Sequence, residues 1–249
     1  ALALFASWYA TRPATASRSY GFYRAEILAA LVNGLALVAI VGFIAWEAIG
    51  RLRVPHEVAG GGMLLVAVAG LAVNLIGIWL LHRHGGEGLN VRGALLHVLG
   101  DAIGSVGAIA AAVIVLATGW SLADPIVSLA IGVIILISAY HLLRQTVDVL
   151  MESVPPHLDL EQIRDDLAAI PGVQKVHDLH VWTLTTGFVS MSGHLVVRSD
   201  GTVADRQRVL LDAQARLRDH FDIQHTTIQL ESPDDPEQPV SCSGDPRCL

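Results

Sequence analysis

The sequence predicts a two-part protein, in which a bundle of membrane-spanning helices is followed by a smaller α+β domain in water. The 249-residue chain has a mean hydropathy of +0.53 and only 16% charged residues, which is too apolar for an ordinary soluble domain. Apolar residues dominate as far as about Leu150, after which the sequence becomes charged and mixed. We therefore expect a transmembrane domain over residues 1–150, a soluble domain over 151–231 and a disordered tail over 232–249.

Apolar segments mark the expected membrane spans. Residues 1–10 end in an aromatic pair that favours the membrane interface, so we interpret them as the second half of a helix rather than as a signal peptide. Because about 20 apolar residues cross a bilayer, we expect full spans at residues 25–50, 63–81, 91–118 and 126–143. The polar loops between them are expected at residues 11–24, 51–62, 82–93 and 120–124.

Arginine is distributed unevenly between the two sides of the expected bundle. The loops at residues 11–24 and 82–93, together with Arg144 after the last span, hold six arginines. The opposite loops hold two, Arg51 and Arg53. By the positive-inside rule, the arginine-rich side is cytoplasmic. The soluble domain follows Arg144 and is therefore expected in the cytoplasm.

The soluble domain shows helix and strand patterns in the order αββαβ. Helices are expected at residues 158–170 and 202–220, and strands at 173–184, 188–198 and 225–230. Thr185, Thr186 and Gly187 are expected to form a hairpin turn between the first two strands. This order predicts a small sandwich with both helices on one face of the sheet.

His97 and Asp101 stand inside the apolar span of residues 91–118. Residues four positions apart lie on the same face of a helix, so both side chains can reach one divalent cation. Ionisable groups in a membrane span are costly and usually face a bundle interior or a water-filled cavity. Two interpretations are open here, a metal site and a hydrogen-bonded pair that joins two helices. The metal site is favoured by small residues in the same region, namely Gly100, Gly104, Ser105 and Gly107.

Charge and motif content exclude several classes of protein. The net charge of −7 argues against a nucleic-acid partner. Cys242 and Cys248 both lie in the expected tail, and their spacing indicates neither a disulfide framework nor a specific metal site. An intramembrane metalloprotease would need an HExxH helix, which the sequence lacks. We therefore expect no enzyme.

Four segments of the chain, in order, resemble the cation diffusion facilitator family. This family includes bacterial zinc, cobalt and cadmium exporters and animal zinc transporters. The resemblance extends to about Glu231. It implies six membrane helices, of which the first and half of the second would precede Ala1. It also implies metal/proton antiport and a cytoplasmic ferredoxin-like domain that forms a homodimer. The four segments are YGFYRAEILAALVN (20–33), LLHVLGDAIGSVG (95–107), ADPIVSLAIGVIIL (123–136) and HDLHVWTLTTGFVSMSGHL (177–195).

The resemblance implies a tetrahedral transport site with two ligands from the second helix and two from the fifth. His97 and Asp101 match the fifth-helix pair, whereas the second-helix pair would lie before Ala1. Zinc usually takes four ligands, so the chain would hold half of this site. The preferred metal is not determined by that half.

Further site residues are implied in the cytoplasmic domain. His177 and His194 match metal ligands of relatives, and Glu231 matches a carboxylate after the last strand. Gln229 stands where some relatives have histidine, which argues against a binuclear site. We expect His180 and Trp182 in dimer or core packing, and His82 and His84 in a solvated loop.

Two more positions in the membrane domain bear on the resemblance. Some relatives bind a second metal in the loop after the second helix, but the matching residues here are Thr15, Arg18 and Phe22, so we expect no site there. Arg24 and Glu152 match a salt bridge that joins the third helix to the end of the sixth. Two interpretations remain, a hinge constraint and two unconnected interfacial charges.

Together these features predict a secondary active transporter in a bacterial plasma membrane. We expect it to export divalent cations, above all Zn²⁺, in exchange for protons, with Zn²⁺ also acting as a regulatory ligand of the cytoplasmic domain. The alternative is a non-transporting membrane metal sensor or scaffold. The intact pair of His97 and Asp101 inside a span favours a transported ion.

Overall fold

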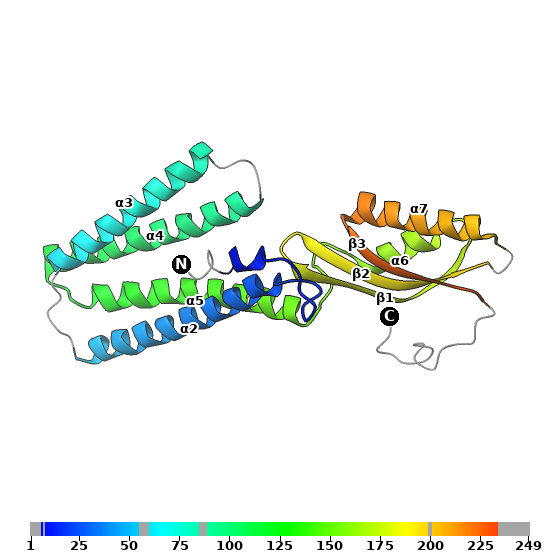
Figure 1. Cartoon of the computed structure of the whole chain (residues 1–249). Helices are drawn as coiled ribbons and strands as arrows, with labels where there is room; N and C mark the ends of the chain where they lie inside the picture. Colours follow the sequence, from blue (N-terminus) through cyan, green and yellow to red (C-terminus); the bar gives the residue numbers. More distant parts are fainter. Residues whose placement is uncertain (1–5, 7, 55–59, 85–88, 199–200, 234–249) are drawn as a thin grey trace. The chain divides into compact units, whose positions relative to one another are not determined.

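The computed structural model describes residues 6, 8–54, 60–84, 89–198 and 201–233, with the side chains of residues 81, 84 and 89–97 outside the description (Figure 1). The chain forms two compact units, one of Ala1–Asn33 with Leu142–Leu249 and one of Gly34–His141. Most of the expected tail, including Cys242 and Cys248, lies outside the described residues.

Four helices are long and apolar enough to cross a membrane, and they correspond to the four expected full spans. Between 6% and 22% of each span is buried within the chain, so most of their apolar side chains face outward, as lipid-facing helices require. The helices are α2 (Arg24–Arg53), α3 (Gly60–His84), α4 (Leu89–Thr118) and α5 (Ala123–Leu150).

Every membrane helix is longer than its predicted span. The difference at the glycines of residues 60–62 corrects the prediction of a loop there. We expected these glycines to end a loop, but they form the first turn of α3. Glycine costs a helix roughly 0.5–1 kcal/mol relative to alanine. That cost is smaller than leaving backbone N–H and C=O groups unsatisfied in a membrane. The loop expected at residues 82–93 is shorter for the same reason, since α3 continues to His84 and α4 begins at Leu89.

Helices α3 and α4 pack through small residues and one polar link. A Cβ on Gly70 would lie 3.6 Å from Ser105 Oγ, and a Cβ on Gly77 would lie 3.4 Å from Val98 Cγ1. Between the two glycines, Asn74 Nδ2 donates a hydrogen bond to Ser105 Oγ over 3.3 Å. Lipid supplies no hydrophobic force that drives helices together, so close packing and polar links hold such pairs.

An ion network joins α2 to α5. Arg51, in the last turn of α2, lies 3.0 Å from Asp124 Oδ2 in the first turn of α5 and also pairs with Glu47 one turn earlier. The Asp124 side chain is only 13% exposed. Arg51 and Asp124 each lie at the helix end whose dipole favours that charge.

The cytoplasmic domain is a three-stranded sheet covered on one face by two helices, in the predicted order (Figure 1). Strand β2 pairs antiparallel with β1 and parallel with β3. The strands are β1 (Val173–Thr185), β2 (Phe188–Val197) and β3 (His225–Glu231), and the helices are α6 (Leu160–Ala168) and α7 (Val203–Phe221).

The ends of these elements follow local hydrogen bonds. Helix α6 begins later than predicted because Asp159 caps it, accepting a hydrogen bond from the Glu161 N–H. Thr202 and Asp205 form a capping box that begins α7. Thr185 belongs to β1 rather than to the turn, since it pairs with Phe188 across a two-residue loop. Gly187 supplies the positive φ of 76° in that loop.

The core lies between the sheet and the two helices. Alternate residues of the strands point into it, so Met191, Leu195 and Val197 of β2 are buried. His194 directly precedes the buried Leu195, so its side chain points to the opposite face of the sheet. The helices contribute Ile163, Leu167, Val209, Ala213 and Leu217 to the core.

We predict that Leu195→Ala destabilises the cytoplasmic domain by about 2–5 kcal/mol, because Leu195 is fully buried and alanine would leave a cavity. The free energy of unfolding can be measured by urea titration of residues 155–233, in which Trp182 is the one tryptophan and reports fluorescence. Leu211→Ala is the matched control, because Leu211 is 54% exposed on α7. It should change stability by less than about 0.5 kcal/mol. Equal effects of the two variants would contradict the described core.

Candidate metal centre

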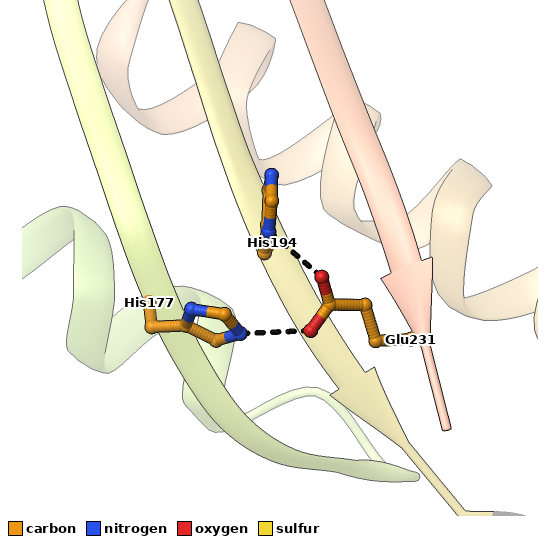
Figure 2. Close-up of side chains that lie close together, drawn as sticks. All are labelled: His177, His194 and Glu231. Carbon is orange, nitrogen blue, oxygen red and sulfur yellow. Dashed lines mark hydrogen bonds and ion pairs between the residues drawn. The ribbon is translucent and has the colours of Figure 1, made fainter. Parts of the chain in front are cut away.

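Three side chains from three strands meet on the face of the sheet that points away from the core (Figure 2). His177 of β1 pairs in register with His194 of β2. His194 pairs with Gln229 of β3, and Glu231 stands two residues further along, on the same face of β3. The register thus gathers His177, His194 and Glu231, whose ligand atoms all lie within 4.8 Å of one another.

The Glu231 carboxylate lies between the two imidazoles (Figure 2). His177 Nε2 is 2.9 Å from Glu231 Oε2, and His194 Nδ1 is 2.8 Å from Glu231 Oε1. The three side chains are between 20% and 28% exposed, so the cluster is half-buried and open to solvent on one side. Two imidazole nitrogens and a carboxylate oxygen are a ligand set that Zn²⁺ takes while keeping a fourth position open.

Gln229 contributes to the cluster as a hydrogen-bond donor. Its amide Nε2 donates to Glu231 Oε1 over 3.0 Å, on the same oxygen that His194 contacts. A glutamine amide nitrogen carries no lone pair for a metal. Gln229 therefore holds the carboxylate in place, whereas a histidine at this position would offer a further ligand.

His180 contacts Asp178 and does not enter the core, so the core-packing alternative for His180 was wrong. Its Nε2 lies 3.1 Å from Asp178 Oδ1, and its side chain is 53% exposed. The other Asp178 oxygen lies 3.6 Å from His194 Nε2. Sequence reasoning missed Asp178, although it sits between two histidines in the segment HDLH (177–180). A role in dimer packing stays a prediction for His180, as does a role in dimer or core packing for Trp182.

Among the described residues, one group of three or more His, Cys, Asp or Glu side chains is close enough to share a metal ion. It consists of His177, His194 and Glu231.

His97 and Asp101 both lie on α4, four residues apart along a continuous helix. The side chain of His97 lies outside the description. The Asp101 backbone carbonyl accepts a hydrogen bond from Ser105 Oγ over 2.9 Å, so Asp101 stands one turn from the link to Asn74.

The start of α2 contacts both the end of α5 and the β1–β2 hairpin. Arg24 Nη2 lies 2.6 Å from Glu152 Oε1, and the two side chains are 40% and 58% exposed. An ion pair this exposed contributes between zero and about 1 kcal/mol. Two residues further along α2, Glu26 Oε2 accepts a hydrogen bond from Thr185 Oγ1 over 3.0 Å. The buried Thr185 is 7% exposed, so this second contact is better shielded from water than the ion pair.

The loop before α2 closes on itself. Thr15 and Arg18 form a short antiparallel bridge through their backbones. The Arg18 guanidinium lies 4.7 Å from the centre of the Phe22 ring, in a cation–π contact. Thr15, Arg18 and Phe22 are the three positions at which we expected no second metal site.

His82 was expected in a solvated loop. It lies instead in the last turns of α3, with its side chain exposed, and His84 is the last residue of α3.

Comparison with known proteins places both parts of the chain in one family. Residues 1–151 match the family model of the cation efflux transmembrane domain, and residues 155–233 match that of the cation efflux protein cytoplasmic domain.

Three relatives are similar along almost the whole chain. The zinc transporter ZitB of Escherichia coli is 45% identical over 232 residues, which are 92% of this chain and 72% of the relative. The metal cation efflux system protein CzcD of Cupriavidus metallidurans is 42% identical over 231 residues, 93% of this chain and 72% of the relative. The cadmium, cobalt and zinc/H(+)-K(+) antiporter of Bacillus subtilis is 39% identical over 233 residues, 93% of this chain and 75% of the relative. The predicted family is thereby confirmed, and the chain belongs to the cation efflux family, also called the cation diffusion facilitators.

Proposed function

We propose that this chain belongs to a secondary active transporter that exports divalent transition-metal cations, above all Zn²⁺, from the cytoplasm in exchange for protons. The observation that carries the proposal is an imidazole and a carboxylate, His97 and Asp101, one turn apart inside a membrane-spanning helix. Such groups are costly in a membrane and are retained where they serve an ion pathway. The family and the transport names of its relatives support the same function.

In the proposed transport site, His97 and Asp101 supply two of four ligands and the second helix of a six-helix bundle supplies the other two. The packing of α3 on α4 supports this arrangement, because the link between Asn74 and Ser105 holds the α4 backbone one turn from Asp101. Close contacts through Gly70 and Gly77 let the two helices move as a pair. The ion is cargo, so it binds and leaves rather than residing in the site.

Proton exchange follows from the chemistry of the imidazole. A histidine must be neutral to bind a metal, so protons and Zn²⁺ compete for His97. Imidazole changes its charge near neutral pH, which makes the competition effective under physiological conditions. A site that releases Zn²⁺ to the outside and takes up a proton there would return the proton to the cytoplasm. The similarity to the cadmium, cobalt and zinc/H(+)-K(+) antiporter of Bacillus subtilis supports this coupling.

The cytoplasmic domain is proposed to be ferredoxin-like, to form a homodimer and to bind regulatory Zn²⁺ at His177, His194 and Glu231. Strand β3 connects this centre to the membrane end of the domain. It ends at Glu231 and begins at His225, whose ring lies 5.7 Å from Tyr20 in the loop before α2. An ion that draws Glu231 toward the histidines would act on a strand whose other end contacts that loop. Arg24 and Glu152 then serve as a hinge constraint.

The alternative is a membrane metal sensor or scaffold that transports nothing. The half-buried cluster on the sheet would suit that function equally well. The two hypotheses differ in whether the membrane pair carries an ion, so Asp101 discriminates between them.

We predict that Asp101→Asn lowers Zn²⁺ uptake into proteoliposomes at least about 10- to 100-fold, the range seen for loss of even a supporting partner in a metal site. Asparagine keeps the volume of the side chain but removes the charge that binds the cation. The measurement uses the full-length protein and a fluorescent zinc indicator in the lumen. Ser138→Ala is the control, since Ser138 donates its hydrogen bond within α5, to the Ile134 carbonyl. Unchanged uptake by the Asp101 variant would contradict the transport site and favour the sensor hypothesis.

We also predict that a proton gradient drives uptake. In inside-out vesicles, whose lumen corresponds to the outside of the cell, an acidic lumen should accelerate Zn²⁺ entry, because luminal protons displace the ion from the site. Collapse of the gradient with an ionophore should return the rate to that of passive equilibration. Uptake that does not respond to the gradient would contradict antiport while leaving metal transport in place.

Finally, we predict that His177→Ala and Glu231→Gln each remove one bound Zn²⁺ per chain, because each variant takes one ligand from the cytoplasmic centre. The zinc content of purified protein, by elemental analysis after gel filtration, measures this loss. His220→Ala is the control, as His220 pairs with Asp166 away from the centre. A zinc content equal to that of the wild type in both ligand variants would refute the cytoplasmic site.

A further inference from the structure

We propose that Asp178 is a positioning residue for the cytoplasmic metal centre, where its carboxylate faces the Nε2–H of His194 and holds the ring with Nδ1 turned toward the bound ion. This inference rests on the proposed binding of metal by His177, His194 and Glu231. It adds a fourth side chain, outside the ligand set, that orients the His194 ring.

The two nitrogens of His194 face different carboxylates. Nδ1 lies 2.8 Å from Glu231 Oε1, on the side shared with His177, whereas Nε2 lies 3.6 Å from Asp178 Oδ2. A neutral imidazole carries one proton. Without an ion, the nearer carboxylate, that of Glu231, favours this proton on Nδ1. When Nδ1 binds a cation, the proton must sit on Nε2. A metal-bound histidine usually directs its remaining N–H to a carboxylate or carbonyl in this way, which fixes the ring orientation.

The distance of 3.6 Å is an ion-pair separation that is longer than a direct hydrogen bond. The Asp178 carboxylate faces the nitrogen that carries the proton once Nδ1 binds the ion, so the contact orients the ring by charge.

The backbone of β1 is distorted at the residue that makes this contact possible. Successive residues of a regular strand point to opposite faces, so Asp178 would point away from its neighbour His177. The pairing of β1 with β2 shifts between His177 and His180, and Asp178 has a φ of 52°, in the left-handed region. This bulge brings the Asp178 side chain to the face that carries His177 and His194. Left-handed backbone at a residue other than glycine is uncommon, and such strain persists mainly at functional sites.

A second histidine holds Asp178 from the other side. His180 Nε2 lies 3.1 Å from Asp178 Oδ1, so each carboxylate oxygen faces a different imidazole. The result is an alternating row across one face of the sheet, from His180 through Asp178, His194 and Glu231 to His177. In this row Glu231 is the carboxylate of the ligand set and Asp178 is the carboxylate that supports it.

The test compares variants that leave the backbone unstrained. Glycine and asparagine both tolerate a left-handed conformation, so Asp178→Gly removes the carboxylate and Asp178→Asn replaces it with an amide that can still accept a hydrogen bond. Asp166→Asn is the matched control, because Asp166 is also held by a histidine, His220, but lies outside the centre.

The first measurement is made on the zinc-loaded, full-length protein in detergent, with ¹⁵N-labelled histidine. The NMR signals of His194 are assigned from their loss in His194→Asn. We expect the wild type to show an Nε2–H proton of His194 that exchanges slowly with water, because the Asp178 carboxylate accepts it, and Asp178→Gly to show faster exchange. Asp178→Asn should retain the slow exchange in large part.

The second measurement is the affinity of the cytoplasmic centre for Zn²⁺, by competition with a chelator. We expect Asp178→Gly to weaken binding about 10- to 100-fold, the range for outer partners of metal ligands. Asp178→Asn should recover part of that loss, and Asp166→Asn should match the wild type. Weaker zinc binding by Asp178→Gly with an unchanged Nε2–H exchange rate of His194 would indicate a merely structural role and overturn the proposal, as would no change in either measurement.

The experiment on His194 also separates the two proposals. If His177→Ala shows that the centre binds no Zn²⁺, the proposed regulatory site fails, and the proposed positioning role fails with it. If the centre binds Zn²⁺ and the Nε2–H exchange rate of His194 does not respond to Asp178, the role of Asp178 alone is refuted.

Discussion

The membrane imposes the constraint on which the first part of this structure depends. Backbone N–H and C=O groups have no water to bond with in the hydrocarbon region, so each crossing segment must satisfy them within a helix. This constraint explains why α2 to α5 are longer than their apolar runs and why the glycines at residues 60–62 are helical. The same constraint explains why one pair of ionisable side chains inside a span indicates an ion pathway. His97 and Asp101 stand in α4 at a cost that an ion pathway would justify.

A different constraint organises the cytoplasmic part. Side chains alternate between the two faces of a strand, so a sheet covered by helices on one face has a second face free for polar chemistry. The three candidate ligands lie on that second face, one on each strand. His177 and Glu231 are 54 residues apart along the chain. The register of the strands alone brings the ligand atoms of the three side chains within 4.8 Å of one another. The parallel pairing of β3 with β2 places Glu231 beside the histidines and His225 at the opposite end.

The two ends of β3 link the candidate centre to the start of the membrane domain. His225 contacts Tyr20 and also Phe188 at the hairpin, whose neighbour Thr185 bonds to Glu26 in the first turn of α2. A sheet transmits displacement along its strands because its hydrogen bonds resist slippage. In the proposed function, metal binding at one end would act on the membrane domain through contacts at the other, in addition to the exposed ion pair of Arg24 and Glu152.

Local patterns in the sequence determined much of this protein. Apolar length predicted the four membrane helices, and periodicity predicted the helix and strand order, because both depend on residues close together in the chain. His97 and Asp101 could be paired from sequence because a helix repeats every 3.6 residues. The tertiary structure alone decided the rest. The contact between Glu231 and His177 depends on strand register, and Asp178 reaches His194 only because a bulge reverses its direction. Neither register nor bulge is encoded in a local pattern, since both result from how separate strands pack over a shared core.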